Sequence, residues 1–308
     1  MPETTLRARA PFDFAATARF LRFSDAEAVD TFNDGRYRRA IHFDERLFLL
    51  TAESQSDGAR PAVHVKLAPE RFVTPQILDE AAQTLSDMFS LTHDLAGWHE
   101  RLKRDALMRR LEAEHRGLRL ARWPTLFESL LTSILLQQIA TSVAVTLRRR
   151  VVERYGERLE MDDEIFYAFP RAEALSRAGI EELRSLGMSN AKATCIVEVA
   201  RACASGELSS ASLEKEDNET VIARLSSLRG IGRWTAEWVL MLHFGRTDVF
   251  AASDLFLRGV IVKYYNKGVA LNEREIRAFA AKRWGAYQSY SALYFLAGMR
   301  AGTITLKP

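Results

Sequence analysis

The first 95 residues contain short segments in which apolar and polar side chains alternate. Residues 63–67 read Val-His-Val-Lys-Leu, with a period of two, and residues 40–50 contain two apolar runs separated by Asp44-Glu45. A period of two is typical of half-buried strands, and short polar breaks of this kind connect antiparallel neighbours. We therefore expect a small antiparallel sheet in this part of the chain.

A helical pattern follows the predicted strands. Thr74 is a typical N-cap and Pro75 suits the first helical position, after which apolar residues recur at helical spacing as far as Phe89. From Gly97 onward the pattern predicts helices joined by short Gly and Pro turns, with a polar connector over residues 209–220. The predicted fold class is α+β. A β-rich N-terminal domain is expected over residues 1–95 and an all-α region over residues 96–308.

Composition narrows the class of protein. The chain has 308 residues, of which 47% are apolar, so it can bury a substantial core. It contains no apolar run near the ~20 residues that span a bilayer, and its first residues lack a signal-peptide pattern. A cytoplasmic location and no membrane partner are expected. The two cysteines, Cys195 and Cys203, are predicted to lie on one helix, and their spacing fits no common metal motif. No metal site of that kind is predicted.

Charge leaves two interpretations open. The net charge of +3 permits nucleic-acid binding without requiring it. Basic residues are concentrated in residues 101–110 and again in residues 148–158. Each group could be a solvated helix face balanced by neighbouring glutamates, or part of a nucleic-acid surface. The second group is the better candidate for a nucleic-acid surface.

One segment couples a phosphate-binding turn to a carboxylate. Gly230-Ile231-Gly232 lies between two apolar helical patterns, and Asp254 follows at the start of another. Glycines placed before a helix let the backbone approach a phosphate with free N–H groups. A carboxylate at a helix N-terminus accepts N–H bonds and stays ionised, which suits the stabilisation of a positive charge that develops nearby. Alone, the same residue could be an N-cap and nothing more.

Together these residues resemble the helix-hairpin-helix superfamily of DNA base-excision glycosylases, in particular its AlkA-type branch. The likeness extends over the segment 127–140, which resembles that family's wedge, over a middle hairpin at residues 186–193, and over residues 284–290 near the C-terminus. It also includes the segment that begins at Pro11 and leads to Phe20. These ordered motifs cover nearly the whole chain.

The resemblance implies specific roles. Asp254 would be the catalytic carboxylate, and Trp234, Trp238 and Phe20 would line the base pocket. Contacts with duplex DNA that contains damaged bases would come from the hairpin and wedge, namely Gly230, Ile231, Gly232, Arg233, Thr235, Gln137 and Gln138. No cofactor is required by this family, although backbone carbonyls of its hairpin hold a monovalent cation, here those of Ser226, Leu228 and Ile231. A monomer, associated with the bacterial nucleoid, is expected.

The implied activity is removal of alkylated purines of the 3-methyladenine and 7-methylguanine class by base flipping. Family members that also cut the strand carry a lysine where this chain has Trp234, so a monofunctional enzyme is expected. The chain departs from the family at Gln138, Leu255, Gln288 and Leu296, which leaves the preferred lesion open. The alternatives are a glycosylase for deaminated or oxidised bases, and a non-catalytic helix-hairpin-helix protein that binds damaged DNA.

Overall fold

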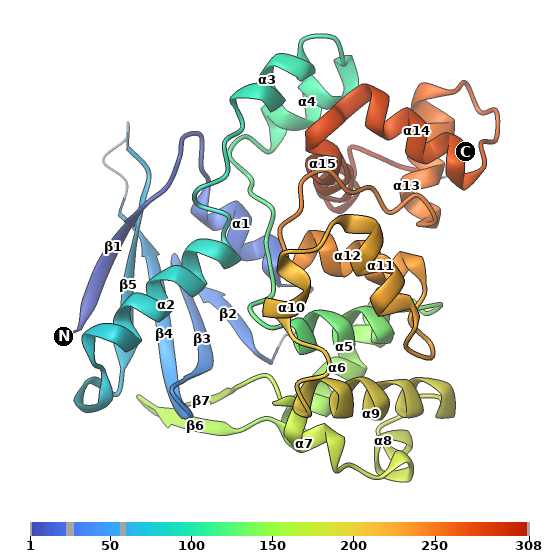
Figure 1. The fold of residues 1–308 in the computed structure, drawn as a ribbon. Helices are drawn as coiled ribbons and strands as arrows, with labels where there is room; N and C mark the ends of the chain where they lie inside the picture. The colour runs from blue at the N-terminus through green and yellow to red at the C-terminus, as the bar shows by residue number, and fades with distance from the viewer. Residues whose placement is uncertain (1, 23–27, 56–59, 307–308) are drawn as a thin grey trace.

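A five-stranded antiparallel sheet forms the N-terminal layer of the protein (Figure 1). The computed structural model describes residues 2–22, 28–55 and 60–306. The strand order is β1-β5-β4-β3-β2, with bounds β1 Glu3–Arg7, β2 Asp30–Asn33, β3 Arg36–Phe43, β4 Arg46–Ser54 and β5 Ala62–Ala68. The predicted antiparallel sheet is confirmed. Strand β1 was not predicted, and it pairs with β5 in the register Glu3↔Lys66 to Arg7↔Ala62.

Two helices share a core with this sheet. Helix α2 (Pro75–Met88) begins as predicted, because the Thr74 side chain accepts a hydrogen bond from the Ile77 N–H at 3.3 Å. Helix α1 (Phe14–Leu21) precedes β2 in the chain. The Phe14 ring stacks on Phe89 at a centroid distance of 5.4 Å, which joins the two helices above the sheet. Phe20, near the end of α1, lines a cavity together with residues of α5 (Leu126–Leu136), α12 (Arg233–Leu242) and α15 (Gln288–Arg300).

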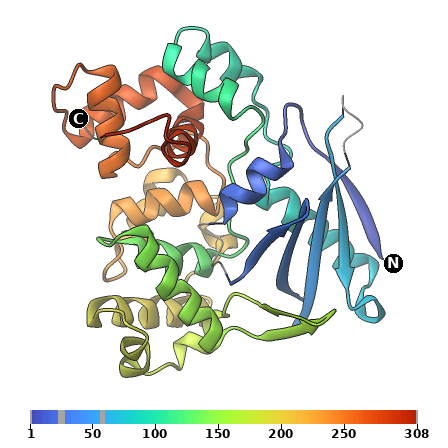
Figure 2. The ribbon, with the colours of Figure 1, turned by 180° about the vertical axis from the view of Figure 1, so that it is seen from behind.

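The rest of the chain is mainly helical and forms the second body seen beside the sheet (Figure 2). None of the helices in the described ranges is long and apolar enough to cross a membrane. The helices are α3 Ala96–Leu102, α4 Ala106–Glu114, α5 Leu126–Leu136, α6 Thr141–Tyr155, α7 Ala172–Ser176, α8 Ile180–Ser185, α9 Asn190–Ala204, α10 Ser210–Glu214, α11 Asn218–Ser226, α12 Arg233–Leu242, α13 Leu255–Val260, α14 Glu273–Trp284 and α15 Gln288–Arg300. A π-helical turn, η2 (Ile261–Tyr265), continues α13.

The prediction of an all-α region over residues 96–308 is wrong at one place. Strands β6 (Arg158–Met161) and β7 (Glu164–Tyr167) form a hairpin inside that region. Its turn residues Asp162 and Asp163 both have positive φ, at 51° and 62°, which is the conformation that tight two-residue hairpin turns require. Phe166 packs with Ala40 and Leu49 of the sheet, so the hairpin covers the sheet face opposite α2. Two four-residue strands are too short to leave a clear periodic signal.

The polar segment 209–220 is also more structured than predicted. It contains α10 and the start of α11, each begun by a side-chain cap, from Ser209 and from Asp217.

The cysteine prediction is confirmed: Cys195 and Cys203 are both on α9 and neither forms a disulfide. Burial raises the pKa of the Cys195 thiol to about 11, so this sulfur stays protonated and acts as an apolar packing group.

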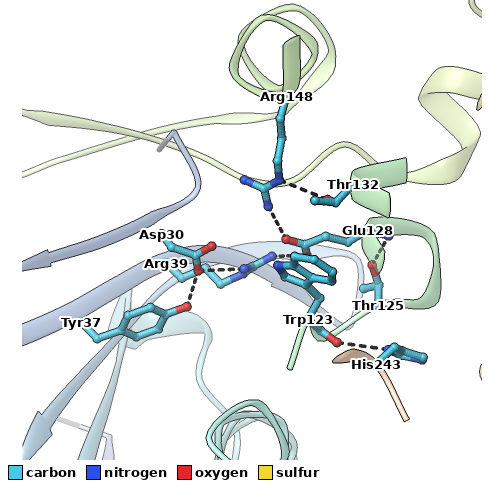
Figure 3. Close-up of polar contacts among 9 residues, drawn as sticks. All are labelled: Asp30, Tyr37, Arg39, Trp123, Thr125, Glu128, Thr132, Arg148 and His243. Carbon is cyan, nitrogen blue, oxygen red and sulfur yellow. Dashed lines mark hydrogen bonds and ion pairs between the residues drawn. The ribbon is translucent and has the colours of Figure 1, made fainter. Parts of the chain in front are cut away.

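A chain of buried charges joins the sheet to the helical body (Figure 3). Arg39 on β3 donates to Asp30 at 2.8 Å and to Glu128 on α5, while Arg148 on α6 donates to the other Glu128 oxygen at 2.6 Å. All four side chains are at most 2% exposed. The two arginines hold the Glu128 charge against the desolvation that raises its pKa.

This arrangement removes Arg148 from the nucleic-acid surface considered for residues 148–158. Arg148 is internal, and several other arginines of the segment are already engaged within the protein. Arg154 pairs with Glu182, Arg158 pairs with Glu160, and Arg150 donates to the Leu186 carbonyl. Arg148 thus serves a structural contact, and a nucleic-acid role for the exposed arginines of the segment stays a prediction.

Candidate active site

The carboxylate of Asp254 is held at the junction of two helices. Asp254 is the N-cap of α13, and its Oδ1 accepts the N–H groups of Phe256 and Leu257, both at 3.0 Å. Its Oδ2 accepts the indole Nε1–H of Trp234, on the first turn of α12, at 3.1 Å. Three donors therefore fix the orientation of the carboxylate. The predicted N-cap is confirmed, and the indole contact adds a partner that the sequence did not indicate.

Asp254 lies on the wall of a cavity of about 470 Å³ between α1, α5, α12 and α15. Trp234, Trp238 and Phe20 line the same cavity, so the structure brings together the four residues predicted for catalysis and base binding. The two indoles meet edge to face, with centroids 6.2 Å apart. A cavity of this size and aromatic lining suits one planar heterocycle.

The predicted phosphate-binding hairpin connects α11 to α12. Gly230 has φ of +82°, and a Cβ added there would lie 2.9 Å from the Cys195 sulfur. Gly232 is the N-cap of α12, and a Cβ added there would meet no atom within 4 Å. Among the described residues, no hydrogen bond uses the N–H of either glycine. These N–H groups, at a helix N-terminus, remain available to an anion.

Comparison with known proteins identifies the family. Residues 131–286 match the model of the HhH-GPD superfamily of base excision DNA repair proteins, and residues 3–124 match that of the AlkA N-terminal domain. The chain belongs to the HhH-GPD superfamily. The predicted resemblance is thereby confirmed. The second match runs past the boundary expected at residue 95, to the start of α5.

Individual relatives agree with this assignment. The chain is 32% identical to a DNA-3-methyladenine glycosylase of Bacillus subtilis, over 70% of this chain and 71% of the relative. It is 28% identical to DNA-3-methyladenine glycosylase 2 of Escherichia coli, over 94% and 95% of the two chains. A solved 3-methyladenine DNA-glycosylase from Archaeoglobus fulgidus superposes with a TM-score of 0.84 at 27% identity, covering 96% of this chain and 98% of that one.

Other predicted DNA-contacting residues have internal partners. Arg233 pairs with Glu219 through two nitrogens, one at 2.9 Å, and its Nε donates to Glu237 at 3.0 Å. Its guanidinium charge is thus balanced within the protein, which raises its pKa. Ile231 and Thr235 are buried, so they support the hairpin from inside. Gln137 and Gln138 follow α5, and Gln138 is exposed while Gln137 contacts the hairpin.

The departures from the family pattern have separate explanations. Leu296 lines the cavity, where it gives an aliphatic wall. Leu255 is 82% exposed and is not among the cavity residues. The Gln288 amide donates to the carbonyls of Asp248 and Gly285, which fixes the start of α15. Of these three, Leu296 alone bears on the shape of the cavity.

The cavity residues that were not predicted include an indole and a cation. Trp123 lies in the segment before α5 and contributes a third indole. Arg300, at the end of α15, stacks over the Phe20 ring with its guanidinium carbon 4.2 Å from the centroid, and donates to the Phe20 carbonyl at 3.1 Å. A cation therefore lies at a cavity that otherwise has mostly apolar walls. The two residues are 280 positions apart, so no local pattern could have indicated the pair.

Proposed function

We propose that this protein is a monofunctional DNA glycosylase that hydrolyses the N-glycosidic bond of alkylated purines, of the 3-methyladenine and 7-methylguanine class, in duplex DNA. The observation that carries the proposal is the Asp254 carboxylate, held by three donors on the wall of an aromatic cavity. The relatives named as 3-methyladenine glycosylases, one of them matched over 94% of this chain, support the substrate class.

The chemistry follows from charge. Alkylation makes the purine cationic and a good leaving group, and its departure leaves positive charge on the sugar. The Asp254 carboxylate stabilises that charge, and the same carboxylate orients the attacking water. The indoles of Trp234 and Trp238 attract the cationic base through their faces. Access requires the nucleotide to leave the duplex, with the turn at Gln138 filling the vacated space.

The absence of strand cleavage rests on the position of Trp234. An amine nucleophile is needed to form a Schiff base with the sugar. No lysine is among the residues that line the cavity in the described part of the chain. Borohydride added during turnover is expected to trap no protein–DNA adduct, and a trapped adduct would show that a lysine reaches the sugar.

A monovalent cation is proposed at the hairpin carbonyls. Within the described ranges, no hydrogen bond ends on the carbonyl oxygen of Ser226 or Ile231, and the Leu228 carbonyl accepts one, from the Ile231 N–H at 3.1 Å. Neutral oxygens of this kind fit a hard cation of low charge. When bound, the cation would supply positive charge beside a DNA phosphate.

The deciding experiment is base release from duplexes that each carry one lesion. Alkylated, deaminated and oxidised purines are compared under single-turnover conditions, with Asp254→Asn as the inactive control. The expected result is that the wild type releases alkylated purines and neither deaminated nor oxidised ones, and that Asp254→Asn shows little release. Release of deaminated or oxidised bases alone would select the alternative glycosylase, and binding without any release would select the non-catalytic protein.

A further inference from the structure

The turn after α5 has a strained backbone at its tip. Gln138, the exposed residue expected to enter the DNA, has φ of +57°. Residues other than glycine rarely adopt this left-handed conformation, because it brings the side chain close to the backbone. The turn therefore needs contacts that hold it in place.

The first of these contacts comes from α9. The Lys192 ammonium donates to the backbone carbonyls of Ile134, Leu135 and Gln137, the last two at 3.1 and 2.8 Å. These carbonyls belong to the final turn of α5 and to the residue that follows it, where the regular helical hydrogen bonds end. The Ile134 carbonyl also accepts the Gln137 N–H at 3.3 Å. Lys192 thus caps α5 and fixes the backbone from which the turn projects.

The second contact is made by one side chain of the turn itself. The Gln137 Nε2 donates to the Gly230 carbonyl at 3.0 Å and to the Thr235 hydroxyl oxygen at 2.9 Å. Gly230 belongs to the hairpin and Thr235 to the first turns of α12. The two elements expected to touch DNA, the wedge turn and the phosphate-binding hairpin, are therefore joined by a single amide group.

The glycine hairpin, which accepts one of the Gln137 hydrogen bonds, is held firmly by its own packing. Gly230 packs so closely on α9 that a Cβ would lie 2.9 Å from the Cys195 sulfur. Since Lys192 is on the same helix, α9 supports both ends of the connection. The amide of Gln137 has little freedom to shift without losing one of its two acceptors.

We propose that Gln137 is a positioning residue for base flipping, which holds the wedge turn at a fixed distance from the phosphate-binding hairpin. Extrusion of a nucleotide needs force on the base stack while the backbone is held. If the two elements could move apart, binding energy at the hairpin would not be available to distort the duplex. This inference rests on the proposed function, and it assigns Gln137 a role that acts through Gln138 without contact with the reacting atoms.

The test uses Gln137→Met, which keeps the length of the side chain and removes its N–H donors. Gln83→Met, on the exposed face of α2, is the matched control, because the Gln83 amide donates to Asp87 at the surface, at 2.9 Å. The probe is a duplex with a tetrahydrofuran abasic site flanked by 2-aminopurine, whose fluorescence rises when the wedge unstacks it. At saturating protein, Gln137→Met should lose most of this rise, while binding to undamaged duplex changes less than about twofold, because the phosphate contacts remain. A full rise would overturn the proposal.

The fluorescence measurement needs no base release. It therefore tests the positioning role of Gln137 independently of the proposed glycosylase activity. Excision provides the second arm, with the same lesion in duplex and in single-stranded DNA. Gln137→Met should slow excision from the duplex about tenfold and from the single strand less than about twofold, because only the duplex must be opened. Equal losses on both substrates would mean that Gln137 only supports the fold, and would overturn the proposal.

A double-mutant cycle tests whether Gln137 acts through Gln138. If it does, Gln137→Met combined with Gln138→Ala should be no slower on duplex DNA than Gln138→Ala alone, within about twofold. Losses that multiply would show two independent contributions and would contradict the positioning role.

Discussion

The indole N–H of Trp234 donates to the Asp254 carboxylate at 3.1 Å, so the same side chain forms a wall of the base cavity and fixes the charged group beside it. The aromatic face and the carboxylate therefore cannot be positioned independently. A base stacked on the indole is also placed relative to Asp254.

We expect Asp254→Asn to lower single-turnover base release by about 10²–10³-fold, because one preorganised charge is lost. Asparagine is also a good N-cap, so the fold should persist. More than half the wild-type rate in Asp254→Asn would contradict the catalytic assignment.

Trp234→Phe keeps an aromatic wall and removes the donor, and it should lower release by about tenfold, the value of one charge-assisted hydrogen bond.

Substitutions of the two hairpin glycines should have different effects, one on DNA affinity and the other on thermal stability. Gly232→Val adds atoms to open space, so thermal stability should be nearly unchanged while binding to damaged and undamaged duplexes weakens. Gly230→Ala strains a residue at φ of +82° and pushes its Cβ against Cys195, so it should lower the melting temperature. Duplex affinity and melting temperature, measured on both variants, check the difference. Unchanged affinity in Gly232→Val would remove the hairpin from the DNA interface.

Arg300 should influence which bases the cavity accepts. Its guanidinium repels a cationic purine, and in a partly solvated site such a pair is worth about 1 kcal/mol. Arg300→Met should therefore raise release of 7-methylguanine relative to neutral hypoxanthine by about fivefold. Arg300→Lys retains the charge and serves as the control, with a ratio close to that of the wild type. An unchanged ratio in Arg300→Met would show that Arg300 acts only as a packing group on Phe20.

Folding stability should depend on His243 in mildly acidic solution. The ring is buried, and its Nδ1 contacts the Trp123 carbonyl at 3.1 Å (Figure 3). Burial lowers the pKa of His243 to about 4, below the ordinary 6.5. The unfolded chain therefore binds a proton first as pH falls, so this contribution is complete above about pH 6.5 and is lost towards pH 4.

At pH 5 the loss from His243 is about 2 kcal/mol relative to pH 7. His243→Gln should be less stable at pH 7 and should lose less stability on acidification than the wild type does. Urea unfolding at the two pH values measures the difference. Equal losses in the two proteins would show that His243 does not titrate in this range.

The sequence indicated those parts of the site whose signals are local. A glycine pair before an amphipathic helix, an N-cap carboxylate and two tryptophans four positions apart each have a short-range pattern, and the structure brings them together. The Arg300–Phe20 contact has none, because it joins opposite ends of the chain. Arg148 shows a second limit. An arginine reads the same in a sequence whether its partner is water or the buried Glu128.

The fold shows the same division. Helix α2 was predicted because its cap and its apolar stripe agree. The β6–β7 hairpin was missed because its few residues acquire their strand character from packing on the distant β3 and β4.

The β6–β7 hairpin and the chain of buried charges both attach the N-terminal sheet to the helical region. Cutting the chain near residue 95 would uncover the sheet face under Phe166 and leave Glu128 without Arg39. Glu128 would keep Arg148 as a partner. Loss of one partner from a buried ion-pair cluster costs roughly 3–5 kcal/mol, a large share of the stability of an ordinary domain. The N-terminal layer therefore acts as an internal wall of the protein, because it supplies one of the two cations that balance the buried Glu128 carboxylate.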